Sequence, residues 1–275
     1  MSFLFFTGKR PAGQQKIAGQ QKIAGQQKAR READEEEDME KKEQLYEGKA
    51  KKVYSTDEQE LLIVEYKDDA TAFNGQKRGT IAGKGAINNC MSNLLMQLLE
   101  KEGIPTHFVR ELNERQTLVK RVEIVPLEVI IRNIAAGSFA KRYGVSEGLI
   151  FDEPTIEFSY KNDELGDPLI NSYHARALKL ASAEEIERIK ELAFAINEKL
   201  REIWAGCSVT LVDFKLEFGR LHDGSIVLAD EISPDTCRLW DSASGEKLDK
   251  DRFRRDLGGV EDAYREVMKR LREHI

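Results

Sequence analysis

Apolar residues recur every three or four positions in three stretches of the chain, and each stretch predicts a helix. The first covers residues 86–99 and stops before Gly103 and Pro105, which disfavour a helix. The second follows a Ser-x-x-Glu capping box that starts at residue 182, and its apolar stripe continues to residue 203. The third covers residues 260–271. We expect the apolar stripes of all three helices to face the core.

Shorter apolar runs, rich in valine, isoleucine and leucine, predict strands before and between these helices. They cover residues 45–54, 61–66, 117–122 and 126–132. Residues 211–231 predict two more strands joined at Asp223-Gly224, a strong signal for a two-residue hairpin loop. The pattern therefore predicts mainly strands early in the chain and a mixture of helices and strands later.

The first 38 residues differ from the rest, because a six-residue unit, AGQQKI, occurs at residues 12–17 and again at 18–23. This repeat and the charge run at residues 30–38 offer too little apolar surface to offset the entropy lost on ordering. We therefore expect residues 1–38 to be a disordered, low-complexity leader. It is a remnant of cloning, an over-extended start or a dispensable tail, and the sequence leaves all three explanations open.

Composition narrows the classes of partner. Of the 275 residues, 40% are hydrophobic and 33% charged, a balance typical of globular proteins. The formal net charge of -6 disfavours a nucleic-acid partner, whose binding domains are usually basic, and favours a small molecule. The sequence has no apolar run of about 18 residues, so we expect no membrane association and a cytoplasmic location. Three widely spaced cysteines suggest reduced thiols.

The predicted hairpin places two acidic residues opposite each other. Counting back from Asp223-Gly224 pairs Glu217 with Asp230, and two facing carboxylates repel unless a cation lies between them. Oxygen-only ligands favour Mg²⁺ or Mn²⁺, held together with nucleotide phosphates. The alternative is a solvated strand face on which Lys215 neutralises the acids. A register slip of one residue would remove the pairing.

Two lysine-containing segments are candidates for binding phosphate. Gly48 permits a close backbone approach, and alternation along a strand places Lys49 and Lys51 on one side. The backbone N–H groups at Gly83-Lys84-Gly85 begin a predicted helix and would attract an anion. Neither segment is a Walker P-loop or a G-x-G-x-x-G turn. Ordinary surface charge is the alternative for both.

Six motifs occur in one order along the chain: YEGKAK, DATAFNGQKRGTIAGKG, VPLEVIIRNIAAGS, LVDFKLEFG, DEISPDTCRLWD and DKDRFR. Together they resemble the SAICAR synthetase family of purine synthesis, over the chain from about Leu45 to the C terminus. The motifs IVPLEVIIRNIAAGS and LVDFKLEFG are very specific, and only the leader lies outside the resemblance. With no second catalytic domain after it, the chain is similar to the single-function bacterial members.

The resemblance implies an α+β fold like the ATP-grasp and kinase architectures. It has a β-rich N-terminal part, residues 39–125, and a mixed α/β C-terminal part, residues 126–275, with ATP in a cleft between them. The resemblance further implies a ligase that uses ATP and Mg²⁺ to join L-aspartate to the carboxylate of carboxyaminoimidazole ribonucleotide. That carboxylate is first phosphorylated, and the aspartate amine then displaces phosphate from the acyl phosphate. A homodimer is a further implication of the resemblance.

The resemblance also implies roles for individual residues. Glu217 and Asp230 would hold Mg²⁺, and the catalytic pair Asp213 and Lys215 would meet the imidazole ring and its carboxylate. The residues expected to bind ATP are Gly48, Lys49, Lys51, Lys120 and Glu128. The residues expected to bind the substrates are Arg132, Ser138 and Arg238, which suit a 5′-phosphate, together with Lys161, Asp167 and Asp235.

Simpler explanations stay open for some of these residues. Asp235 begins a turn before Thr236, Asp167 belongs to a Gly-Asp-Pro turn, and Arg132 has the option of pairing with a structural acid. His174 is assigned no chemistry.

Two other functions also remain open. One is an ATP-dependent ligase acting on a different acid or amine, and the other is a nucleotide-binding regulator without turnover, which the presence of both metal-ligand candidates disfavours.

Overall fold

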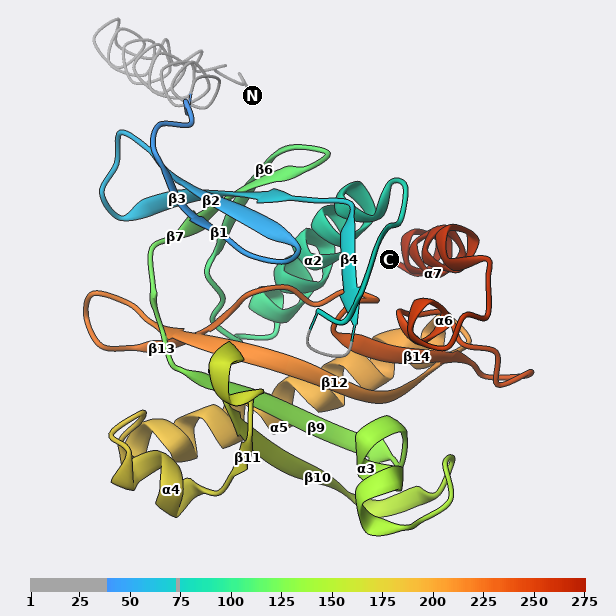
Figure 1. Ribbon diagram of the computed structural model, residues 1–275. Helices are drawn as coiled ribbons and strands as arrows, with labels where there is room; N and C mark the ends of the chain where they lie inside the picture. Colours follow the sequence, from blue (N-terminus) through green and yellow to red (C-terminus); the bar gives the residue numbers. More distant parts are fainter. Residues whose placement is uncertain (1–38, 73–74) are drawn as a thin grey trace, which may run out of the picture. The chain divides into compact units, whose positions relative to one another are not determined.

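A computed structural model describes residues 39–72 and 75–275 (Figure 1). Residues 42–275 form one unit of tertiary contacts, and every element named below lies within it. The predicted leader, residues 1–38, lies outside the described residues. No helix in the described part of the chain is long and apolar enough to cross a membrane.

Five antiparallel strands form the first sheet, in the order β1-β2-β3-β7-β6 (Figure 1). Their bounds are Gln44–Glu47 (β1), Lys51–Ser55 (β2), Leu61–Tyr66 (β3), Phe108–Asn113 (β6) and Gln116–Lys120 (β7). Helix α2 (Lys84–Lys101) packs against β3, β6 and β7 and buries Met91, Leu95 and Leu99 completely. The helix predicted at residues 86–99 is therefore confirmed, with its apolar stripe in the core.

The N-terminal strands differ from the prediction in three places, one of which is β6, a strand that was not predicted. The single strand predicted at residues 45–54 is two strands, because the chain turns back after Glu47 and the N–H of Gly48 donates to the carbonyl oxygen of Lys51 at 2.8 Å. A separate hairpin, β4 (Asp69–Ala72) and β5 (Lys77–Thr80), was not predicted. Its strands are four residues long and mostly polar, so they carry little periodic signal.

The second sheet follows the order β11-β10-β9-β12-β13, with β8 and β14 also paired to β12. The bounds are Glu123–Ile124 (β8), Leu127–Ile134 (β9), Ile150–Tyr160 (β10), Leu169–Ile170 (β11), Val209–Arg220 (β12), Ile226–Ala229 (β13) and Cys237–Asp241 (β14). The twelve-residue strand β12 pairs with four neighbours and forms the centre of this sheet. It therefore positions side chains from four other strands.

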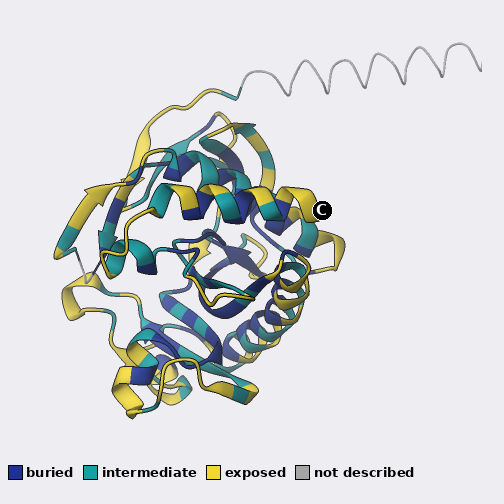
Figure 2. Ribbon diagram, turned by 90° about the vertical axis from the view of Figure 1, so that its right-hand side faces the viewer, coloured by how far each residue is buried: buried dark blue, intermediate teal, exposed yellow. Residues whose placement is uncertain are grey.

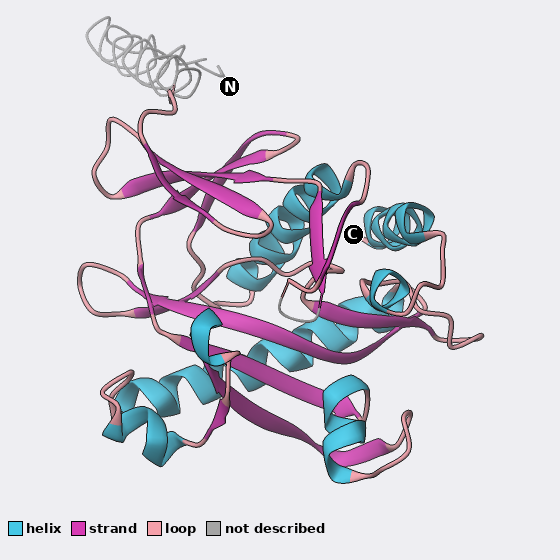
Figure 3. Cartoon of the chain, in the orientation of Figure 1, coloured by secondary structure: helices cyan, strands magenta, loops and turns pink. Residues whose placement is uncertain are grey.

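Helix α5 (Ala183–Gly206) lies against β12 and contributes most of its apolar face to the core (Figure 3). The predicted capping box at its start is present: Ser182 and Glu185 each accept the other's backbone N–H. Helix α7 (Val260–His274) buries one face and exposes the other (Figure 2). The shorter helices are α3 (Gly137–Tyr143), η1 (Asp163–Leu165), α4 (Ser172–Ala177) and α6 (Asp251–Arg254).

The β12–β13 hairpin forms, but its predicted register is wrong by one residue. The N–H of Leu221 donates to the carbonyl oxygen of Ser225 and the N–H of Gly224 donates to that of Leu221, both at 2.9 Å. The loop thus has three residues, and Gly224 adopts the left-handed φ of 81° that a three-residue loop needs at this point. Glu217 consequently faces Ala229, and Asp230 lies one residue beyond β13.

The sheets also bear on the predicted division of the chain at residue 125. Strand β8 belongs to the predicted N-terminal part and yet pairs with β12 of the C-terminal part. A division into residues 39–125 and 126–275 stays a prediction.

The complete burial of Leu200 on α5 predicts how much stability a cavity in the core would remove. Leu200 is fully buried and Leu178 is 56% exposed. Leu200→Ala should lower the free energy of unfolding by about 2–5 kcal/mol, because it removes buried methyl groups and leaves a cavity. Urea unfolding measures this, with Leu178→Ala as the matched control. Equal losses in the two variants would contradict the packing described here.

Candidate active site

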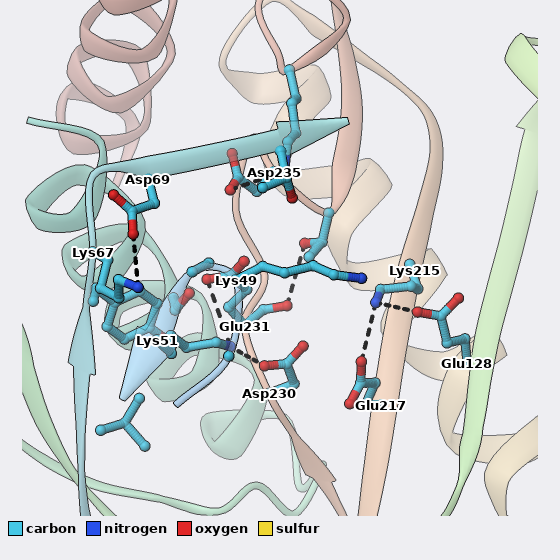
Figure 4. Close-up of a pocket in the computed structure, with 18 of the residues that line it drawn as sticks. Lys49, Lys51, Lys67, Asp69, Glu128, Lys215, Glu217, Asp230, Glu231 and Asp235 are labelled. Atoms are coloured by element: carbon cyan, nitrogen blue, oxygen red, sulfur yellow. Dashed lines mark hydrogen bonds and ion pairs between the residues drawn. The ribbon is translucent and has the colours of Figure 1, made fainter. Parts of the chain in front are cut away.

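A cavity of about 1520 Å³ contains all the site residues that the sequence analysis proposed. Its walls come from the turn between β1 and β2, from β9 and β12, and from the segment after β13 (Figure 4). The residues that line it are Gly48, Lys49, Lys51, Lys120, Glu128, Arg132, Ser138, Lys161, Asp167, Asp213, Lys215, Glu217, Asp230, Asp235 and Arg238. Residues up to 190 positions apart in the sequence thus share one space.

Glu217 and Asp230 reach this cavity as neighbours in space, although they are not ladder partners. An oxygen of Glu217 accepts from the Nζ atoms of Lys161 at 2.9 Å and Lys215 at 3.1 Å. Asp230 accepts from the Nζ atom of Lys51 (Figure 4). The charge of Lys51 also acts on Glu217, so this lysine faces both carboxylates. Lysine ammonium groups thus neutralise both acids.

Burial and charge work against each other at Glu217. Its side chain is 6% exposed, and burial alone would raise its pKa. The ammonium groups of Lys215 and Lys161 outweigh burial and lower the pKa of Glu217 to about 2. Burial would likewise lower the pKa of Lys215, but Glu217 and Glu128 outweigh it and raise that pKa. Both groups are therefore charged at neutral pH.

The two lysines of the β1–β2 turn have different partners. Lys49 Nζ lies 2.8 Å from an oxygen of Asp163 in η1, and both side chains are exposed. Lys51 is mostly buried, lies over the ring of Tyr66 at 5.3 Å and pairs with Asp230. Burial lowers the pKa of Lys51, although Glu231 and Glu217 oppose this effect. The structure confirms the glycine turn, and it brings both lysines to the cavity.

Two guanidinium groups flank Asp213 in the middle of the second sheet. Asp213 pairs across β12 with Arg132 of β9 on one side and with Arg238 of β14 on the other. Its carboxylate accepts from Arg132 at 2.5 Å and from Arg238 at 2.9 Å and 3.0 Å. Arg132 also donates to Ser138 at 3.5 Å. Two cations and a hydroxyl thus meet at one place, which suits an anion.

Gly137 allows Arg238 to take this position. Its φ of 52° is left-handed, and a Cβ atom there would lie 2.4 Å from a terminal nitrogen of Arg238. Arg238 is also fixed by Asp251, which accepts from its Nε atom at 2.9 Å. The glycine of the AAGS motif therefore has a physical role: it leaves room for the guanidinium.

The remaining substrate candidates have internal partners. Asp235 accepts from Lys84 at 2.9 Å, from Lys250 at 3.4 Å and from the hydroxyl of Tyr264 at 2.6 Å, so three groups share its charge. An oxygen of Asp167 accepts from the N–H of Asn162 at 2.9 Å and closes the turn around η1. Contacts of this kind stabilise the cavity wall. Roles for the two acids toward a substrate stay predictions.

The ATP candidates Lys120 and Glu128 also line the cavity. Lys120 Nζ donates to the carbonyl oxygen of Thr106 at 3.0 Å, and Glu128 accepts from Lys215 at 2.6 Å. Beside Lys120 lies His107, which the sequence analysis did not single out. Burial, and then the charges of Lys51 and Lys120, lower the pKa of His107 to about 3. This imidazole is neutral at physiological pH.

Sequence reasoning missed four carboxylates that line the cavity, of which only Glu231 is buried; the other three are Glu47, Asp69 and Asp163. Glu231 is 5% exposed, and its Oε2 atom accepts no hydrogen bond from the described residues. The Nζ atom of Lys51 lies 3.7 Å from that oxygen. Alternation along a regular strand would turn Glu231 away from Asp230. The available signal was the Asp-Glu pair at the start of DEISPDTCRLWD.

The lowered pKa of Glu217 predicts that the stability of the fold depends on pH. Its pKa is lower in the folded chain than the usual 4.5, so it stabilises the fold above about pH 4.5, and this contribution is lost as the pH falls toward 2. Glu217→Gln should therefore destabilise the fold at pH 7, and its difference from the parent should shrink by about 3 kcal/mol on acidification. Urea unfolding at a series of pH values measures this.

The control for this prediction is Glu202→Gln, at a position 68% exposed on α5. Its effect should be small at every pH, since exposed ion pairs contribute little. A destabilisation by Glu217→Gln that stays constant from pH 7 to the acid limit would contradict the charge assignment.

Comparison with known proteins shows the family of this chain. The sequence model of SAICAR synthetase matches residues 44–271. The phosphoribosylaminoimidazole-succinocarboxamide synthase of Lachnoclostridium phytofermentans is 66% identical over 85% of this chain and 99% of its own length. The enzyme of the same name from Caldanaerobacter subterraneus subsp. tengcongensis is 63% identical over 86% of this chain and all of its own.

Solved structures show the same fold. The crystal structure of phosphoribosylaminoimidazole-succinocarboxamide synthase from Ehrlichia chaffeensis has a TM-score of 0.83 and 48% identity, covering 85% of this chain and 99% of that one. A SAICAR synthetase solved in complex with ADP has a TM-score of 0.80 and 49% identity, covering 82% of this chain and 96% of that one. The chain belongs to the SAICAR synthetase family, whose members are ATP-dependent ligases of purine biosynthesis.

Proposed function

We propose that this cavity joins L-aspartate to the carboxylate of carboxyaminoimidazole ribonucleotide by way of an acyl phosphate. The observation that carries the proposal is the order of charged groups along one face of β12. Asp213 with its two arginines, then Lys215, then Glu217 follow at alternate positions, about 7 Å apart. This row suits a substrate with a phosphate at one end and a reacting carboxylate at the other.

The arginine end of the row suits the 5′-phosphate of the ribonucleotide. Arg132, Arg238 and Ser138 provide charge-assisted and hydroxyl hydrogen bonds. Asp213 keeps both guanidinium groups in place, and its second role would be to meet the imidazole ring. Lys215 lies two residues further along β12, where its ammonium group would stabilise negative charge on the substrate carboxylate as it attacks ATP.

The other end of the row suits ATP and magnesium. Lys49 and Lys51 would contact the phosphates beneath the turn at Gly48. A similar SAICAR synthetase was solved in complex with ADP, which supports nucleotide binding by this chain. Lys120 and Glu128 would flank the adenine and ribose, while Lys161, Asp167 and Asp235 would lie near the substrates.

The donor atoms fit magnesium. Within residues 39–72 and 75–275, no three histidine, cysteine or acidic side chains are gathered into a metal site. Two carboxylates, Glu217 and Asp230, with the remaining ligands from water and phosphate, are nevertheless the usual protein contribution to Mg²⁺ binding. When bound, the ion would neutralise charge on the transferring phosphoryl group. The acidic oxygen of Glu231, which accepts no hydrogen bond, adds to the negative character of this corner.

A cytoplasmic homodimer is the remaining part of the proposal. It rests on the family resemblance. Sedimentation velocity of the purified chain tests the dimer, and a monomer at micromolar concentration would contradict it.

The test of the reaction is turnover with defined substrates. The protein should release ADP when ATP, Mg²⁺, the ribonucleotide and L-aspartate are all present, and Glu217→Gln should reduce that rate strongly. Turnover with another amino acid and none with aspartate would favour a ligase of different specificity. ATP binding without ADP release would favour a regulator.

Arg238→Ala tests the phosphate site separately. The KM for the ribonucleotide should rise by the equivalent of about 1.5–3 kcal/mol, since a charge-assisted hydrogen bond is lost. Steady-state kinetics with the ribonucleotide varied measures this, and Arg188→Ala, at a half-exposed position on α5, is the control. An unchanged KM in Arg238→Ala would place the phosphate elsewhere.

A further inference from the structure

Lys51 is shared by two successive carboxylates. Its Nζ atom pairs with Asp230 and lies 3.7 Å from the Oε2 atom of Glu231, from the segment that follows β13 (Figure 4). The three side chains are 17%, 21% and 5% exposed, respectively. The longer contact is too long for a hydrogen bond, so Asp230 is the carboxylate that holds the lysine in the structure.

The backbone at Asp230 makes this sharing geometrically feasible. Successive side chains of an extended strand point to opposite faces. Asp230 has a φ of 62°, which ends β13 and breaks that alternation. Aspartate tolerates the left-handed region better than most residues, but the conformation still has a cost and needs its surroundings to hold it. Here it places consecutive carboxylates beside one ammonium group.

One carboxylate oxygen of Glu231 has no hydrogen-bond partner among the described residues. The backbone oxygen of Glu231 accepts from the hydroxyl of Thr236 at 3.3 Å, while Oε2 is buried without a hydrogen bond. An unmatched buried carboxylate oxygen is unfavourable unless another state of the protein satisfies it. Within the described residues, the cation that forms an ion pair with that oxygen is Lys51, at 3.7 Å.

We propose that Glu231 is a positioning residue that retains Lys51 when Asp230 turns to the metal ion of the incoming nucleotide. The inference rests on the proposed role of Asp230. A carboxylate that binds a divalent cation no longer serves a lysine fully, so Lys51 loses its main partner at that step. A shift of about 1 Å gives it a hydrogen bond to Glu231 instead.

This exchange also explains how Lys51 becomes available to phosphate. An ammonium group has three N–H donors. With Asp230 engaged elsewhere, Glu231 uses one donor and fixes the side chain, and the other donors are free for the nucleotide. Lys51 thus stays in the cavity as a charged group instead of following Asp230 or swinging away.

The decisive measurement is ADP affinity with and without Mg²⁺, by titration calorimetry of the full chain. Glu231→Gln keeps the size of the side chain and removes its charge. It should weaken ADP binding by about tenfold with Mg²⁺, and by less than about twofold in EDTA, where Asp230 still holds Lys51. Glu187→Gln makes the same chemical change at a position 67% exposed on α5 and should alter neither value.

A double-mutant cycle separates positioning from other roles. If Glu231 acts through Lys51, then Glu231→Gln should have no further effect in a Lys51→Met background. Electron paramagnetic resonance measures Mn²⁺ binding in the same background. If Glu231→Gln abolishes that binding, Glu231 is a metal ligand and the inference is overturned. Equal weakening with and without Mg²⁺, together with a lower Tm, would make its role structural and also overturn it.

Two further variants distinguish a failure of this inference from a failure of the proposed metal role of Asp230. If Glu231→Gln does not fold, Glu231→Asp retains the charge with a shorter reach and should show a smaller, still Mg²⁺-dependent loss. Asp230→Asn should abolish the effect of Mg²⁺ on ADP affinity. If it does not, the proposed metal role is wrong and the inference fails with it. If it does, and Glu231→Gln binds Mg²⁺ and ADP like the parent, only the inference is wrong.

Discussion

The site depends on the matching of charges along the inner face of β12. Asp213, Lys215 and Glu217 are three charged side chains in alternate positions of a central strand, and burying any one of them alone would be strongly unfavourable. Each is paired by a side chain from another element: arginines from β9 and β14, Glu128 from β9, and Lys161 from the segment after β10. These pairings fix the order of charge within the cavity.

The proposed reaction follows the same constraint. Lysines are the counter-ions of Glu217 and Asp230 in the structure. Under the proposed function, a nucleotide would bring its own negative charge and its own cation, so the carboxylates and lysines would exchange partners without leaving a net charge unmatched. The β1–β2 turn and the left-handed residue after β13 bring these groups to one place.

Much of this architecture was predictable because the relevant signals are local. The helices at residues 86–99, 182–203 and 260–271 have long apolar stripes, and the structure confirms each of them. The short strands β4, β5 and β6 carry no comparable periodicity and were missed. Strands β8, β10, β11 and β14 of the second sheet were not predicted either. Motifs identified the family because they combine residue types in an order that chance rarely produces.

The hairpin shows the limit of local reasoning. Asp223-Gly224 correctly predicts a turn, but the number of loop residues, and with it the register, depends on how β12 is held by its other neighbours. The sequence by itself determined the three long helices, the turn and the family, and it predicted many of the charged residues that line the cavity. Only the tertiary structure decided which charges meet, because ion pairs between Lys51 and Asp230, or between Arg238 and Asp213, join segments that local periodicity does not relate. Glu231 belongs to this second group, since a single left-handed residue before it turned its side chain toward the cavity.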